Sequence, residues 1–192
     1  MLTRAEIEAI FKETGVLQEG HFLLTSGYHS ARYLQCAQVL QYPQKAELLC
    51  RSLANFFSAA EIDLVLGPAT GGIILAYEMA RQLGTKGIFA ERTDGKMTLR
   101  RGFEIKRKER VLVVEDVVTT GGSVKEVVDL VIRHGGEAVA VAGLVDRSGG
   151  KSDFGIPAHF LLTMEVEAYP PERCPLCAQG SLPVKPGSRD LK

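Results

Sequence analysis

The sequence predicts an α/β fold built on a mostly parallel sheet, and two observations support this prediction. Short apolar runs rich in β-branched residues recur along the chain without polar alternation, which is typical of strands buried on both faces. Segments with helical periodicity lie between these runs. Because strand, turn and helix repeat in this order, we expect βαβ units flanking a parallel sheet with helices.

The expected elements follow from these patterns. Apolar runs place strands at residues 62–67, 86–92, 110–116, 138–147 and 158–166. Helical patterns cover residues 45–60, 72–84 and 123–136, and the last two end in glycine, a common helix stop. We expect one domain over residues 1–192. Three segments lie outside the repeated βαβ pattern. They are a helix plus a small hood or hairpin (1–40), a flap (91–110) and a loosely structured tail rich in proline and glycine (169–192).

Composition and charge exclude several classes of protein. Lys plus Arg and Asp plus Glu each number 23, so the basic excess of a general nucleic-acid binder is missing. The first residues lack the apolar core of a signal peptide, and no stretch is long and apolar enough for a membrane span. The four cysteines are therefore expected to be reduced thiols in the cytoplasm.

The stretch VLVVEDVVTTGGS, residues 111–123, carries the most chemistry. It places Glu115 and Asp116 at the carboxyl end of a buried strand, which is where ligands bind in open parallel sheets. The Thr/Gly-rich turn at 119–123 leads into a helix, whose first N–H groups form an anion site that glycines let a phosphate approach. The turn therefore predicts a phosphate cradle.

The two acids require a different partner, because they repel a phosphate. They suit hydroxyl groups, or a Mg²⁺ ion held by hydroxyls and oxyanions. Ribose 5-phosphate offers a phosphate and a vicinal diol, so it fits both halves of the stretch. The P-loop and dinucleotide-binding motifs are missing from the sequence. A plain strand, turn and helix cap is the remaining alternative, although a cap needs only one such residue.

The same stretch resembles the 5-phosphoribosyl 1-diphosphate (PRPP) signature of the type I phosphoribosyltransferases. This resemblance implies their fold, a parallel sheet flanked by helices with a small N-terminal hood. It also implies that Asp116 and Glu115 are catalytic and that Mg²⁺ is a cofactor, with no residue assigned as a metal ligand. The substrate-binding residues that it implies in the loop are Val117, Val118, Thr119, Thr120, Gly121, Gly122 and Ser123.

Three further segments resemble the orotate phosphoribosyltransferase family: HFLLTSGYHSARYLQ (21–35), VLGPATGGIILA (65–76) and GLVDRSGG (143–150). The resemblance covers nearly the whole chain and implies transfer of a phosphoribosyl group from PRPP to orotate in pyrimidine biosynthesis. Two alternatives stay open. One is a phosphoribosyltransferase for a purine or another base, and the other is a regulator that senses PRPP and binds nucleic acid.

Arg147 is the candidate for binding the orotate carboxylate. It ends the fourth strand, and an arginine can bind a carboxylate through two parallel hydrogen bonds. The competing interpretation is a surface pair between Arg147 and Asp146. Adjacent residues on a strand point to opposite faces, which weakens that interpretation.

The charged segment 91–110 is either a solvated loop or a basic lid over an anionic substrate. The resemblance favours the lid, and it implies that Arg92 binds pyrophosphate and that Lys96 is catalytic. It further implies a homodimer in which each flap closes over the neighbouring subunit. Where many relatives carry lysines or a flap histidine, this chain has Gly71, Thr25 and Thr98.

Cys174-Pro-Leu-Cys177 is a single C-x-x-C motif. A structural zinc site usually needs two more ligands, and the other cysteines lie far away in sequence. The four histidines, His21, His29, His134 and His159, show no ligand spacing. We therefore expect a plain turn in the tail, with a zinc site and a redox pair as alternatives. We interpret His134 as structural, because a cation in the last turn of a helix suits the helix dipole.

Overall fold

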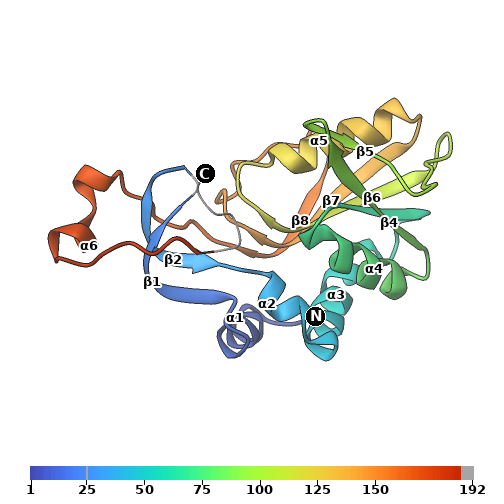
Figure 1. Ribbon diagram of the computed structural model, residues 1–192. Helices are drawn as coiled ribbons and strands as arrows, with labels where there is room; N and C mark the ends of the chain where they lie inside the picture. The colour runs from blue at the N-terminus through green and yellow to red at the C-terminus, as the bar shows by residue number, and fades with distance from the viewer. Residues whose placement is uncertain (25, 187–192) are drawn as a thin grey trace.

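A six-stranded sheet forms the centre of the structure, a computed structural model that describes residues 1–24 and 26–186 (Figure 1). Its strands, in their order across the sheet, are β5 (Lys96–Thr98), β4 (Lys86–Thr93), β3 (Leu64–Pro68), β6 (Arg110–Val118), β7 (Glu137–Asp146) and β8 (Ala158–Thr163). Only the pairing of β4 with β5 is antiparallel. The predicted α/β class with a mostly parallel sheet is confirmed. β6 lies between β3 and β7, so its carboxyl end is central.

Helices cover both faces of this sheet, as Figure 1 shows. Four lie on one side, namely α1 (Arg4–Glu13), α2 (Ala37–Leu40), α3 (Pro43–Ala54) and α4 (Gly71–Leu83), while α5 (Gly122–Arg133) lies on the other. Side chains of β6 alternate between the two cores: Leu112 and Val114 pack with α3 and α4, whereas Val111 and Val113 pack with α5. Burial on both faces explains the unbroken apolar runs of the sequence.

The turn from β3 into α4 depends on glycine. A Cβ atom at Gly67 would collide with the carbonyl oxygen of Gly72. The strand and the first turn of the helix therefore approach more closely than any side chain would permit. This close approach fixes where α4 begins, directly beside Asp116 near the end of β6.

A two-stranded hairpin, β1 (Leu17–Leu23) and β2 (His29–Leu34), forms the small hood that the sequence predicts. The prediction of a loosely structured tail is wrong for the described part. That part contains the short helices Pro171–Arg173 and α6 (Pro175–Ala178), and it wraps around the hairpin (Figure 1). The backbones of Tyr169 and His29 exchange two hydrogen bonds of 2.8 Å, and the Val184 N–H donates to the carbonyl of His21 at 2.7 Å. Residues 187–192, like Thr25, lie outside the described residues.

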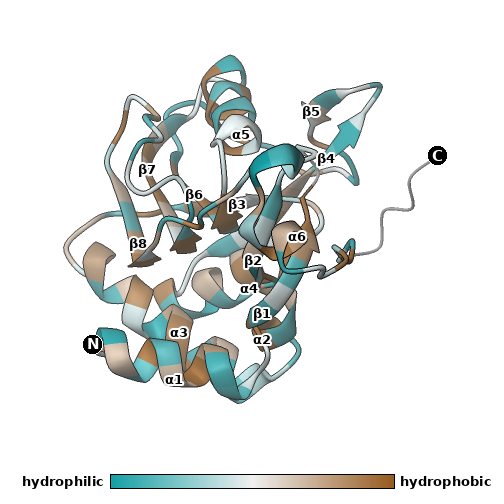
Figure 2. Cartoon of the chain, turned by 90° about the vertical axis from the view of Figure 1, so that its left-hand side faces the viewer, coloured by the Kyte–Doolittle hydropathy of each residue, from teal (hydrophilic) through white to brown (hydrophobic). Residues whose placement is uncertain are grey.

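The flap contains the antiparallel pair β4–β5, with Thr93 opposite Lys96 at its turn. Figure 2 shows this pair standing out beside α5 as a hydrophilic projection. The flap therefore contains two antiparallel strands joined by a turn. Within the described residues, no helix has both the length and the apolar character needed to cross a membrane.

Candidate active site

The two acids of β6 lie where the strand meets the surrounding turns. Asp116 is buried, with 9% of its surface exposed, and lies against the first turn of α4. A Cβ atom at Gly71 would be 2.6 Å from each carboxylate oxygen of Asp116. Glycine at this position therefore leaves room for the carboxylate, whereas any side chain there would require Asp116 to move.

Burial and mutual repulsion shape the charge of this pair. Burial, and after it the charge of Asp116, raises the pKa of Glu115 to about 9. Burial also raises the pKa of Asp116. The Asp116 N–H donates to Glu115 Oε1 at 3.2 Å and the Val117 N–H to Asp116 Oδ1 at 2.9 Å. Among the described residues neither acid forms an ion pair. The pair thus suits ligand hydroxyls or a cation, which would satisfy both carboxylates.

A pH-dependent stability follows from the raised pKa of Glu115. Between about pH 5 and 9 the folded chain holds a proton that the unfolded chain releases, so the free energy of unfolding falls as pH rises, by up to about 1.4 kcal/mol per pH unit. Glu115→Gln should flatten this decline and make the ligand-free protein more stable than the parent at pH 8. Urea unfolding at several pH values measures how the free energy of unfolding depends on pH in each protein. The exposed Glu61→Gln is the control, and identical slopes in parent and Glu115→Gln would contradict the expectation.

The loop after β6 forms a small concavity of about 60 Å³ at the start of α5. Its lining residues are Glu115, Val117, Val118, Thr119, Thr120, Gly121, Gly122, Ser123 and Val124. Gly121 has φ +77°, and a Cβ atom there would be 3.0 Å from the Phe154 ring. No described side chain caps α5, so its first N–H groups are left for a ligand. This geometry suits a phosphate, and the assignment of the loop residues to phosphate binding stays a prediction.

Arg147 directly follows β7, the neighbour of β6, and its backbone N–H donates to the carbonyl of Val118 at 2.8 Å. Its guanidinium is half-buried, and Nε has no hydrogen-bond partner among the described residues. Burial lowers the pKa of Arg147, while the Tyr33 phenol and the Cys36 thiol act in the opposite direction. A partly desolvated cation of this kind is suited to an anionic group of a ligand.

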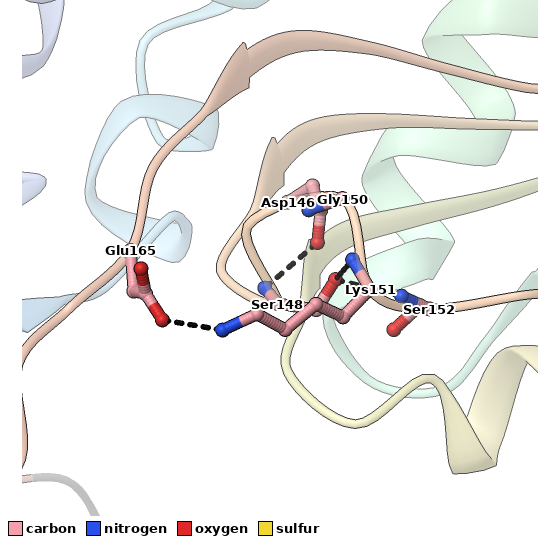
Figure 3. Close-up of polar contacts among 6 residues, drawn as sticks. All are labelled: Asp146, Ser148, Gly150, Lys151, Ser152 and Glu165. Carbon is pink, nitrogen blue, oxygen red and sulfur yellow. Dashed lines mark hydrogen bonds and ion pairs between the residues drawn. The ribbon is translucent and has the colours of Figure 1, made fainter.

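Asp146 is engaged elsewhere, which excludes the pairing of Arg147 with Asp146. Its two carboxylate oxygens accept the N–H groups of Ser148 and Gly150, each at 2.8 Å (Figure 3). The Ser148 hydroxyl oxygen accepts the N–H groups of Lys151 and Ser152, each at 3.0 Å. These bonds make residues 146–152 a self-supporting turn that holds Arg147 at the end of β7.

The basic flap residues do not meet the acid pair within one chain. Arg92 forms an ion pair of 2.9 Å with Glu126 of α5. Lys96 is exposed and lines a separate concavity of about 830 Å³ between the flap and the outer face of α5. The structure therefore brings Glu115 and the phosphate loop together, but it leaves Arg92 and Lys96 outside this group.

Comparison with known proteins identifies the family. Residues 37–168 match the family described as the phosphoribosyl transferase domain. The chain is 61% identical to an orotate phosphoribosyltransferase of Caldicellulosiruptor saccharolyticus over 183 residues, which are 95% of this chain and 96% of that protein. This chain belongs to the orotate phosphoribosyltransferase family.

Other orotate phosphoribosyltransferases agree with this assignment. The one from Pelotomaculum thermopropionicum is 58% identical, and the match covers 99% of this chain and all of that protein. Among solved structures, the orotate phosphoribosyltransferase of Mycobacterium tuberculosis H37Rv in complex with inorganic phosphate superposes with a TM-score of 0.69 at 25% identity, covering 83% of this chain and 95% of that one. The fold predicted from the resemblance is confirmed.

Sequence reasoning did not indicate one buried residue that lies close to this orotate phosphoribosyltransferase site. Cys36 is 1% exposed, and its pKa is raised well above the ordinary value by burial and then by the charge of Asp116, while Arg147 lowers it. It therefore lies near both the acid pair and the arginine. No spacing in the sequence indicates this, because Cys36 reaches the site only through the packing of α2 against the sheet.

Proposed function

We propose that this chain transfers the 5-phosphoribosyl group from PRPP to orotate in the cytoplasm, giving orotidine 5′-monophosphate and pyrophosphate for pyrimidine biosynthesis. One observation carries the proposal: the ends of two adjacent parallel strands present complementary groups. β6 ends in the acid pair and the phosphate loop, while β7 ends in the half-buried Arg147. A sugar phosphate and an anionic base fit such neighbours.

The chemistry is positioning and electrostatic stabilisation. A ring nitrogen of orotate attacks C1 of the ribose, and pyrophosphate leaves from the opposite face with inversion at C1. The transition state has positive charge on the sugar, which Glu115 and Asp116 stabilise while they hold the ribose hydroxyls. Residues 119–123 anchor the 5′-phosphate, and Arg147 holds the carboxylate of the base. No protein nucleophile is required.

The acid pair also fits the Mg²⁺ that the family resemblance implies. Both side chains supply oxygen, the donor that Mg²⁺ prefers, and neither is paired with a cation among the described residues. Glu115 and Asp116 are the residues that would hold the ion. When bound, Mg²⁺ supplies charge neutralisation for the departing pyrophosphate.

We further propose a homodimer in which Lys96 and Arg92 of each flap serve the partner's site. This proposal rests on the separation of the flap from the acid pair within one chain. Lys96→Ala and Asp116→Asn should each be nearly inactive alone. Mixing and reassociating them should restore up to about a quarter of parent activity, because half of the dimers then hold one intact site. Recovery no greater than the sum of the separate variants would contradict a shared site.

The decisive test is the ultraviolet loss of orotate in the presence of PRPP and magnesium, with adenine, guanine and hypoxanthine as competitors. We expect consumption of orotate alone, at a rate that depends on PRPP. Turnover of a purine instead would favour the phosphoribosyltransferase alternative. No turnover of any base, together with nucleic-acid binding, would favour the regulator.

A further inference from the structure

Four potential metal ligands converge at the junction of the hood and the tail. They are His21 of β1, His29 of β2, and Cys174 and Cys177 at either end of the turn that forms α6. One ligand atom from each lies within 4.8 Å of all the others. These histidines show no ligand spacing in the sequence, but the fold brings them to the C-x-x-C motif as the two additional ligands that a zinc site needs.

Four of the six distances between the ligand atoms are close to those of a tetrahedral site, and all six lie within 4.8 Å. Nε2 of His21 lies 3.0 Å from Nδ1 of His29, 3.5 Å from Sγ of Cys174 and 3.8 Å from Sγ of Cys177. Sγ of Cys177 lies 3.3 Å from Nδ1 of His29. Ordinary zinc bond lengths give tetrahedral edges of about 3.3 Å between nitrogens and about 3.6 Å between nitrogen and sulfur. The observed edges agree with these to within about 0.4 Å.

Hydrogen bonding alone does not account for this convergence. His21, His29 and Cys174 are buried, with 7%, 6% and 3% of their surface exposed. Between Nε2 of His21 and Nδ1 of His29 only one proton can be shared, yet both nitrogens also face sulfur atoms. Nδ1 of His21 has no partner among the described residues, so no network on the far side of the ring holds it in this orientation.

We propose that His21, His29, Cys174 and Cys177 bind one structural Zn²⁺ ion that fastens the tail to the hood. Two thiolates and two neutral imidazoles balance the charge of Zn²⁺, so the buried site carries no net charge. All four positions are filled by protein, which is typical of structural rather than catalytic zinc. This site is separate from the acid pair and the phosphate loop, and it does not depend on the proposed reaction.

The backbone around the cluster is arranged to present the ligands. His21 and His29 lie within the two strands of one hairpin, and the tail pairs with that hairpin on both sides of the C-x-x-C motif, at Tyr169 and at Val184. The Ala178 N–H donates to the carbonyl of Cys174 at 3.1 Å, closing the turn that brings the two thiols to one side. The metal would thus join the two strands of the hairpin to a tail segment that is distant in sequence.

Metal content of the full chain, purified without a histidine tag, tests the proposal. After removal of metal, reconstitution with Zn²⁺ and desalting, we expect about one zinc per chain. Cys177→Ser and His29→Gln should each lower zinc affinity by more than about 100-fold, since even lost outer-shell partners cost about 10–100-fold. The controls Cys50→Ala and His134→Gln, which change a cysteine and a histidine outside the cluster, should retain the ion.

Measurements on the parent chain keep the test valid if the variants fail to fold. Co²⁺ in place of Zn²⁺ should show the visible bands of a tetrahedral site and a sulfur-to-metal charge-transfer band. Trypsin should cleave after the exposed Arg173 several-fold faster in the metal-free form than in the zinc form. Retention of no zinc, retention of iron in preference to zinc, a cobalt spectrum without the sulfur band, or a disulfide between Cys174 and Cys177 would each overturn the proposal.

Discussion

Asp116→Asn is expected to lower kcat by at least about 100-fold, the range seen when one preorganised electrostatic group is removed from a transition state. The carboxylate is buried beside Gly71 and has no cationic partner among the described residues, so its negative charge is available to the ribose and the sugar cation. Asparagine keeps the oxygen that accepts the Val117 N–H, and it removes a charge that burial disfavours. The free energy of unfolding at pH 8 should therefore not fall.

Steady-state kinetics measure kcat of Asp116→Asn, and urea unfolding of the same preparation measures its free energy of unfolding. Asp129→Asn, which makes the same chemical change on the exposed face of α5, is the matched control and should keep parent kcat. A variant at position 116 that retains parent turnover would remove Asp116 from the catalytic role. A parallel loss of stability and activity would assign it a structural role instead.

Arg147→Ala should raise the dissociation constant of orotate by roughly 100-fold, about 2.7 kcal/mol, and change that of PRPP by less than about twofold. The guanidinium is half-buried with an unpartnered Nε, while Asp146 is fully occupied by backbone N–H groups. Loss of the side chain therefore removes a ligand contact without releasing a buried protein partner. The dissociation constant of orotate for Arg147→Lys should lie between those of the parent and Arg147→Ala. Lysine keeps the positive charge, but its ammonium group cannot form two parallel hydrogen bonds.

Separate calorimetric titrations of orotate and PRPP distinguish the loss of a specific contact with orotate from a general disturbance of the site. Arg133→Ala, an exposed arginine at the end of α5, serves as the control. Unchanged orotate affinity would show that another group binds the carboxylate. An equal loss for both ligands would mean that the variant deforms the ends of β6 and β7 together.

Much of the fold could be read from the sequence because its signals are local. The apolar run before Glu115 predicts a doubly buried strand, and Leu112 and Val113 of β6 indeed pack into opposite cores. The acid pair and the phosphate loop could be read for the same reason, since they are contiguous from 115 to 123 and one strand and one helix start position them all.

The rest depends on contacts between segments far apart in the chain. Cys174 and His21, which face each other, are separated by 153 positions, and no periodicity links them. Cys36 comes close to Asp116 and Arg147 through the packing of a four-residue helix, and Arg92 pairs with Glu126 across 34 positions. Such contacts follow from how the elements assemble, which local propensity and spacing do not specify.

The connections that follow β6 and β7 have different proposed roles, and this has a practical consequence for changing the base specificity of the protein. Under the proposed function, the acid pair and the phosphate loop at the end of β6 bind the sugar phosphate, whereas Arg147 after β7 binds the base. Libraries that vary only residues 147–157 could therefore change which base the protein accepts while preserving the binding of PRPP. Such libraries must leave Phe154 and Ser152 unchanged, because both side chains lie against Gly121. Substitutions there would also alter the phosphate loop.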